Sequence, residues 1–297
     1  MKNKIPGLLL IAVLLLTGCS HDPSGELPST PETVSLLLSG TQSALETRTS
    51  LPELPQGSTT GIYVPEKEKD ISTAYFNNAC YTAGESGILQ ASSSTVIDLT
   101  VGMSYDIYAY GPFRTIVTDP AAIAFTHGND VIYAPKSTVT GVTADNRTAI
   151  LNFEHRAAQI DFSVIFADDY NLTDKQITSA STIEVAGFYP VATLDLITGN
   201  LTPTGAATAS LSSSGIGAPG AMELAIPPTC FIPGTDQMSL VVKVTHQGKE
   251  FNGTITETFV AGMSYRYTVT VNGTVAPLAI TGTLRDWTTV SETIPIQ

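Results

Sequence analysis

The chain has 297 residues, 42% of them hydrophobic and only 14% charged, and its formal net charge is −13 at pH 7. So much apolar sequence with so few charges excludes a disordered polyampholyte, and the length suits one large domain or two modest ones. The acidic balance also excludes a nucleic-acid partner, since neutralising phosphates needs clustered Lys and Arg.

Residues 1–18 have the features of an export signal. Lys2 and Lys4 precede an apolar run from Leu8 to Leu16, which is too short to span a bilayer and is flanked like a signal peptide. The run ends in Leu16-Thr17-Gly18-Cys19, which resembles a bacterial lipobox. We therefore expect a lipoprotein signal peptide and a mature chain held to a membrane by acyl groups on Cys19. The alternative is ordinary secretory cleavage with a cysteine nearby.

Beyond a Pro-, Ser- and Gly-rich tether at 19–32, short alternating segments predict one β-strand after another. The clearest alternations place Ile160, Phe162, Val164 and Phe166 on one face, and Met238, Leu240, Val242 and Val244 on another. No long stretch has helical periodicity, and Ala121–Phe125 is compatible with a short turn. The other expected strands are Thr33–Leu38, Gly61–Val64, Thr95–Val101, Tyr105–Tyr110, Val131–Ala134, Ala149–Phe153, Thr182–Tyr189, Met222–Ile226 and Tyr265–Val271.

An eight-residue echo indicates an internal duplication. Val101–Tyr108 (VGMSYDIY) recurs as Ala261–Thr268 (AGMSYRYT), and in both copies a glycine-led turn precedes a tyrosine-rich alternating strand. We therefore expect an N-terminal β-sandwich at 33–154 and a C-terminal one at 155–297.

The sequence contains no recognisable catalytic, cofactor-binding or metal-binding pattern. Its four histidines have no mutual spacing typical of a metal site. Gly215–Gly220 superficially resembles a phosphate loop, yet it contains Pro219 and lacks a strand-to-helix context. An enzyme is therefore not expected. The histidines are His21, His127, His155 and His246.

Besides Cys19, the mature chain has two cysteines, Cys80 and Cys230. An oxidising compartment permits a disulfide between them. Their separation and their assignment to two expected domains leave two buried thiols as the alternative.

Three segments resemble the fimbrillin-like, or type V pilin, family. Leu151–Ile160 (LNFEHRAAQI) looks like the family's F-x-H-x-x-A-x-φ stretch, Ile280–Trp287 (ITGTLRDW) is similar to its late strand and recurrent Trp, and Tyr105–Pro112 (YDIYAYGP) is typical of its first domain. The resemblance covers nearly the whole chain. It implies an all-β fold of two tandem transthyretin-like β-sandwich domains and a structural or adhesive role in a cell-surface fimbria.

The resemblance also implies a processing site, because in such pilins a trypsin-like, Arg-specific protease cuts a loop after the first strand. Arg48 and Thr49 match that site in kind and place. A cut there would detach Cys19 with its lipid and free the segment that carries Val34, Leu36 and Leu38. The alternatives are that Arg48 is only an exposed loop residue, or that the chain is an uncleaved, lipid-retaining anchor.

Loss of the first strand would leave an apolar groove bordered by unpaired backbone groups, which a neighbour's extended segment can fill by strand addition. The candidate donor is the tail from Trp287 to Gln297, with Val290, Thr293 and Ile296 as its apolar or β-branched residues. The expected partners are other pilin subunits, in a homo- or hetero-polymer, the outer membrane through Cys19, and the protease. The expected location is the outer membrane, the cell surface or a fimbrium, and shaft, tip and anchor roles stay open.

The competing class is a glycan-binding surface lipoprotein. In that interpretation Tyr108, Tyr110, Phe113 or Tyr133 would stack on sugar rings, although aromatics in alternating strands more often pack in a core.

Overall fold

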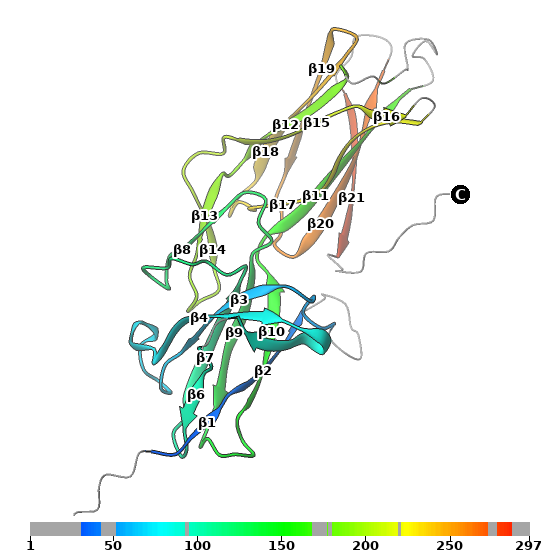
Figure 1. Ribbon diagram of the computed structural model, residues 1–297. Coiled ribbons are helices and arrows are strands. Elements are labelled where there is room, and N and C mark those ends of the chain that lie inside the picture. Colours follow the sequence, from blue (N-terminus) through cyan, green and yellow to red (C-terminus); the bar gives the residue numbers. More distant parts are fainter. Residues whose placement is uncertain are drawn as a thin grey trace, which may run out of the picture. The chain divides into compact units, whose positions relative to one another are not determined.

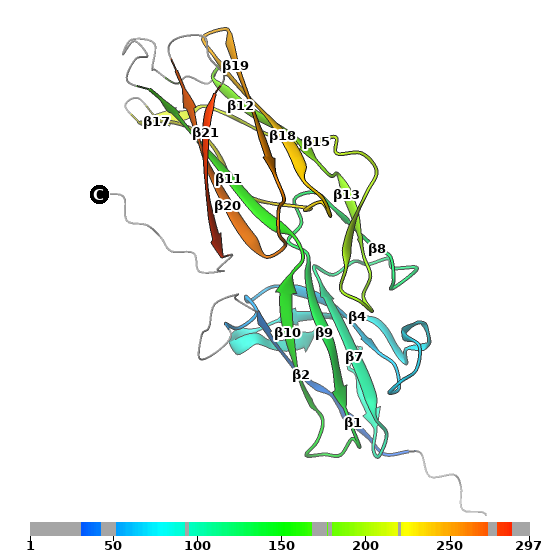
Figure 2. The same ribbon diagram turned by 180° about the vertical axis from the view of Figure 1, so that it is seen from behind.

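The computed structural model describes residues 31–42, 52–92, 95–167, 177, 180–218, 221–272 and 278–286, and Figures 1 and 2 show it from opposite sides. Every regular element in these residues is a strand, apart from two short 3-10 turns at Ile71–Thr73 and Glu85–Gly87. The expected all-β fold class is confirmed. Within the same residues, no helix has the length and apolar character needed to cross a membrane.

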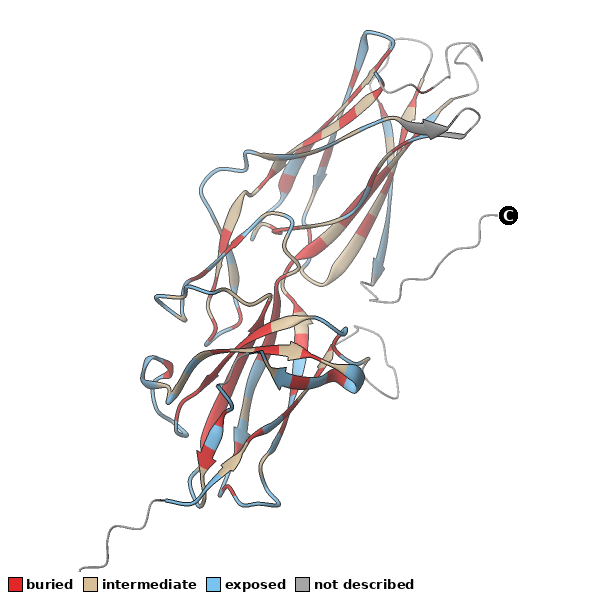
Figure 3. Cartoon of the chain, in the orientation of Figure 1, coloured by how far each residue is buried: buried red, intermediate tan, exposed pale blue. Residues whose placement is uncertain are grey.

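Seven strands of the N-terminal half form a closed sheet in the order β10-β2-β5-β4-β3-β7-β9. The closed sheet surrounds an apolar core, and β10 illustrates how: Ala149, Leu151 and Phe153 are buried, while the residues between them are exposed. Figure 3 shows the distribution of buried and exposed residues over the chain. Neighbours run antiparallel except β2 and β10, which run parallel. The strands are β2 (Leu37–Gln42), β3 (Thr59–Val64), β4 (Phe76–Ala83), β5 (Ile88–Ala91), β7 (Tyr105–Gly111), β9 (Ile132–Val139) and β10 (Thr148–His155), and β1 (Thr33–Ser35) pairs separately with β6 (Asp98–Thr100).

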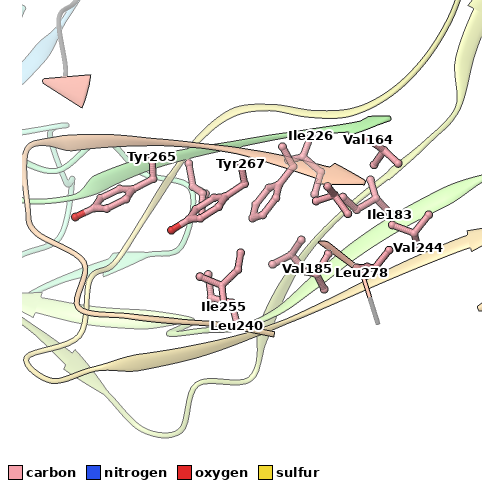
Figure 4. Close-up of a cluster of buried hydrophobic side chains, with 14 of the residues drawn as sticks. Val164, Ile183, Val185, Ile226, Leu240, Val244, Ile255, Tyr265, Tyr267 and Leu278 are labelled. Carbon is pink, nitrogen blue, oxygen red and sulfur yellow. The ribbon is translucent and has the colours of Figure 1, made fainter. Parts of the chain in front are cut away.

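The C-terminal half has two sheets, with the orders β16-β17-β11-β20-β21 and β15-β12-β18-β19. Their alternate residues bury into one apolar cluster, part of which Figure 4 shows. The inward faces expected for residues 160–166 and 238–244 are confirmed. The strands are β11 (Ala158–Phe166), β12 (Thr182–Phe188), β15 (Ala209–Ser214), β16 (Ile216–Ala218), β17 (Ala221–Phe231), β18 (Met238–His246), β19 (Lys249–Glu257), β20 (Met263–Val271) and β21 (Ala279–Asp286).

A third sheet, of three antiparallel strands, joins segments of both halves, and for that reason alone we call it the mixed sheet. β13 (Val191–Leu194) lies between β14 (Leu201–Thr204) and β8 (Ile123–Thr126), antiparallel to both. Residues 123–125, which belong to the expected turn at Ala121–Phe125, are therefore part of a strand. The mixed sheet contributes Phe125 and Leu194 to a third core that contains Tyr63, Tyr110 and other tyrosines of the closed sheet. Residues from Glu32 onward accordingly form one compact unit.

The sequence echo corresponds to a repeated local structure. Gly102 and Gly262 both adopt positive φ, at 86° and 76°, where glycine avoids the strain of a side chain. The Tyr105 hydroxyl accepts a hydrogen bond from the Thr100 amide at 3.2 Å, and the Tyr265 hydroxyl accepts one from Val260 at 2.8 Å. Each tyrosine thus fastens the turn that precedes its own strand.

Cys80 in β4 and Cys230 in β17 are free thiols. Burial raises the pKa of Cys230 to about 12, so this thiol stays protonated at neutral pH and is a poor nucleophile. Of the two alternatives, separate thiols are the one that the structure contains.

Candidate functional site

β2 is an inner strand of the closed sheet rather than an edge strand. On one side it pairs with β10 over six residue pairs, from Leu37 with Thr148 to Gln42 with Phe153, and on the other it pairs with β5. The Leu54 amide also donates to the Gly40 carbonyl at 3.0 Å. We call the position that residues 36–42 fill between β10 and β5 the β2 slot. A chain without β2 would expose backbone donors and acceptors on both walls of this slot.

The three residues expected on the displaced strand differ in depth. Leu36 and Leu38 are buried in the core of the closed sheet, whereas Val34, in β1, is partly buried against it. Their expected single strand is interrupted at Leu36, whose amide donates instead to Ile97 at 2.8 Å. Leu36 and Leu38 therefore supply most of the apolar anchoring of this segment.

The middle of the β2 slot accepts only a glycine without rearrangement. A Cβ atom on Gly40 would lie 3.1 Å from Leu54 Cδ2 and 3.2 Å from Phe153 Cε2, closer than ordinary packing allows. Both neighbours are fully buried. The Phe153 ring thus occupies the space that a side chain at position 40 would need.

A buried polar group closes the far end of the slot. Gln42 Nε2 lies 2.8 Å from His155 Nε2, and His155 Nδ1 lies 2.7 Å from Asp130 Oδ1. With the amide donating, His155 accepts at Nε2 and donates from Nδ1 to the Asp130 carboxylate. Gln42 and His155 are buried, and only Asp130 of the three reaches solvent. The sequence analysis included His155 in the family-like stretch Leu151–Ile160 and did not single out Gln42.

The last described strand, β21, lies at a sheet edge. It pairs antiparallel with β20 along its whole length, and residues 281–285 are exposed. Gly282 faces the Tyr267 ring of β20, where an added Cβ would lie 2.6 Å from Cε1. Leu278, just before the strand, is buried in the C-terminal core (Figure 4), and Ile280 packs against it.

β21 repeats the side-chain pattern of β2. Residues 36–42 read LLLSGTQ and residues 278–284 read LAITGTL. Both place apolar residues at the first and third positions and glycine at the fifth, where each glycine lies beside an aromatic ring of the neighbouring strand. The two segments differ at the seventh position, Gln42 against Leu284. The sequence analysis did not include β21 in its candidate donor, and this likeness is the sequence signal that could have identified it.

The remaining predicted site residues lie outside the described residues: Cys19, Arg48, Thr49, Val290, Thr293 and Ile296. In the part of the chain that the structure describes, no three His, Cys, Asp or Glu side chains are grouped as a metal site requires.

The aromatic platforms suggested for glycan binding are wrong for three of the four residues. Tyr108, Tyr110 and Tyr133 are buried in the core beneath the mixed sheet, so their ring faces cannot receive a sugar. Burial raises the pKa of Tyr110 to about 12. Phe113 is partly buried, and its amide is bound to the Thr59 carbonyl.

Comparison with known proteins gives a family and a fold. The family model described as fimbrillin-like matches residues 47–287, while no curated protein matches the chain. Among solved structures, a candidate cell adhesion protein from Bacteroides uniformis is 21% identical with a TM-score of 0.64, covering 86% of this chain and 98% of its own. Another, from Bacteroides ovatus, is 17% identical with a TM-score of 0.62, covering 86% and 99%. At these identities the two structures show a shared fold.

Proposed function

Because this chain belongs to the fimbrillin-like family, whose members are structural and adhesion proteins rather than enzymes, we propose that it is a fimbrial subunit that polymerises by exchange of β2. In this proposal a lipid on Cys19 carries the chain to the outer membrane, and an Arg-specific protease cuts between Arg48 and Thr49. The chain folds as two tandem transthyretin-like domains, 33–154 and 155–297. A strand of a neighbouring pilin subunit then fills the β2 slot.

The observation that carries the proposal is the inner position of β2. A strand that pairs on both sides and buries Leu36 and Leu38 leaves, once removed, both a row of backbone partners and an apolar bed. Such a site favours another strand over water. The family match begins at residue 47, beyond β2 and next to the proposed cut.

The proposed donor is the C-terminal segment, comprising β21 and the tail with Val290, Thr293 and Ile296. β21 supplies the apolar, apolar, glycine pattern of β2 through Leu278, Ile280 and Gly282. It lies at an edge, so it can leave β20 without opening the interior of a sheet.

The first experiment is N-terminal sequencing and intact mass of the protein from surface and membrane fractions. A lipid-free chain beginning at Thr49 in fibres is the expected result. Arg48→Lys keeps the charge but removes the guanidinium that an Arg-specific protease recognises, so it should abolish both the cut and fibre growth. Wild-type fibre yield from this variant would contradict the proposal. An N-terminus at acylated Cys19 would instead make the chain an anchor.

The donor is tested separately. Gly282→Val should stop fibre growth, because the new side chain would meet the residue that lines the middle of the neighbour's slot, as Phe153 does beside Gly40 in this chain. Thr283→Val on the opposite face of β21 is the matched control. Deletion of residues 288–297 tests the tail. Wild-type fibre yield after that deletion would remove Val290, Thr293 and Ile296 from the donor and leave β21.

A further inference from the structure

The polar end of the β2 slot requires a hydrogen-bond donor, which an apolar side chain cannot supply. His155 is buried, and the hydrogen bond from Gln42 satisfies its Nε2 atom at 2.8 Å. Because Asp130 accepts the proton of Nδ1 at 2.7 Å, the ring is oriented with Nε2 toward the slot. Any strand that replaces β2 removes the Gln42 amide from this atom.

β21, the donor strand proposed for this chain, has no side-chain amide at the position that corresponds to Gln42. When β21 is aligned with β2 on its apolar and glycine positions, Leu284 takes the place of Gln42. A leucine side chain offers no hydrogen bond, and a buried group that loses its partner is costly. In its own chain Leu284 is 55% exposed, so nothing in the packing of β21 requires a polar residue there.

We propose that His155 and Asp130 make the β2 slot selective for strands of another subunit type, with the pattern apolar-x-apolar-x-Gly-x-Gln or Asn. The inference rests on the proposed strand exchange and deepens it by naming the partner. Gly40 fixes the register of the strand because only glycine fits beside Phe153. In that register His155 lies opposite the side chain two residues further on, and it favours one that can donate a hydrogen bond. β21 of a second copy fits the first three positions and fails the fourth. Subunits of this chain therefore join preferentially to a different subunit, and a homopolymer is disfavoured.

Peptide competition tests the selectivity in the folded protein. A site for a sequence-specific protease is placed between Gln42 and Pro52, and the folded chain is cut so that β1 and β2 stay bound without a covalent link. A fluorescent peptide of residues 32–42 is then exchanged into the slot and competed with unlabelled variants. The Gln42→Leu peptide should compete about tenfold less well than the native peptide. A Leu37→Gln peptide is the matched control, because Leu37 is half exposed and points out of the slot.

A second pair of peptides carries the β21 sequence, residues 278–286, with and without Leu284→Gln. The glutamine version should compete about tenfold better, and in a cut His155→Leu chain this preference should vanish. If that chain does not fold, the peptide series on the wild-type chain decides alone. In the full-length protein, Leu284→Gln should raise homopolymer yield without changing thermal stability.

The outcomes separate the two proposals. If no peptide enters the slot at any concentration, strand exchange itself is wrong, and the selectivity falls with it. If all peptides exchange with equal affinity, strand exchange stands and the role of His155 is overturned. Equal homopolymer yield from the wild-type and Leu284→Gln chains would also overturn it.

Discussion

The closed sheet of the N-terminal half and the two sheets of the C-terminal half follow the same strand order, but only the first is sealed. Each half contains one parallel pair, β2 with β10 and β11 with β20. From there the order β2-β5-β4-β3-β7-β9 corresponds to β11-β17-β15-β12-β18-β19. In the N-terminal half β4 pairs with β5 and β9 with β10, whereas the corresponding C-terminal pairs are not joined among the described residues.

In the C-terminal half, two additional strands, β16 and β21, lie where the corresponding pairs of the N-terminal half are joined. β21 occupies the side of β20 that β9 occupies on β10, and β16 extends the sheet beyond β17. A sealed sheet can admit a strand only by losing one, while an open sheet can gain or release one at its edge. The first half is therefore suited to accept a strand, and the second to give one.

The largest expected effect comes from loosening the link between the halves. Phe125, in β8 of the mixed sheet, is fully buried, with its ring centroid 6.0 Å from that of Tyr110 and 4.7 Å from the Arg114 guanidinium carbon. Phe125→Ala should cost about 3–5 kcal/mol and split one calorimetric transition into two. Phe162→Ala removes a ring from the C-terminal core alone and should lower the transition without splitting it. Two transitions in the wild-type chain would contradict the link.

A smaller effect should separate the sealed sheet from the open one. Gly40→Ala must displace Leu54 or Phe153 in a closed core and should cost about 1–3 kcal/mol of global stability. Gly282→Ala meets Tyr267 more closely, yet it lies on an edge strand that can shift. Its effect should be confined to faster hydrogen exchange in β21, with an unchanged denaturation midpoint. An equal global loss from both variants would show that β21 is as firmly held as β2.

One buried carboxylate in each half allows a matched electrostatic comparison. Burial raises the pKa of Asp161 despite the Arg266 guanidinium 2.9 Å away. Although burial acts the same way on Asp106, hydrogen bonds from Thr138, the Glu68 amide and Lys136 hold the pKa of Asp106 below its usual value. Arg266→Met should therefore cost about 1–2 kcal/mol, and Lys136→Met less than about 1 kcal/mol.

Carboxyl NMR titrations check the cause of that difference. The pKa of Asp161 should rise further in Arg266→Met, while the pKa of Asp106 should move less in Lys136→Met because two other donors remain. A larger loss of stability in Lys136→Met than in Arg266→Met would contradict this account.

The smallest expected effect is a pH dependence at the junction of the halves. Both ring nitrogens of His127 are buried and have no hydrogen-bond partner among the residues that the structure describes, and the centroid of its ring lies 5.0 Å from that of Phe188. Burial lowers the pKa of His127 in the folded chain, so the unfolded chain binds the proton more readily. Stability should therefore fall as the pH drops below about 6.5, the unfolded value. His127→Phe should flatten the unfolding free energy over that range, and an unchanged slope would assign it to other groups.

The sequence predicted where individual strands lie better than it predicted which strands pair with each other. Alternation located β11 and β18 because their inward residues are strongly apolar. It missed β4 and β15, where Asn, Thr and Ser dilute the signal, and it missed β13, which has only four residues. The expected strand at 95–101 is paired only at Asp98–Thr100. No local pattern reveals that β2 lies beside β10, since Thr41 and Asn152 are 111 residues apart. The importance of Gln42 depends on that pairing, so it emerged only with the fold.

The long separation between β2 and β10 also sets an order in time. Pairs so distant in sequence form late in folding, because closing the intervening loop costs entropy before any contact is made. β2 can pair with β10 as soon as residues 148–155 have emerged on the side of the membrane where the chain folds, and β21 follows these residues in the chain. The amino-terminal strand therefore reaches the vacant position first in every new molecule. Chain order alone delays competition from the C-terminal strand until the sheet has closed.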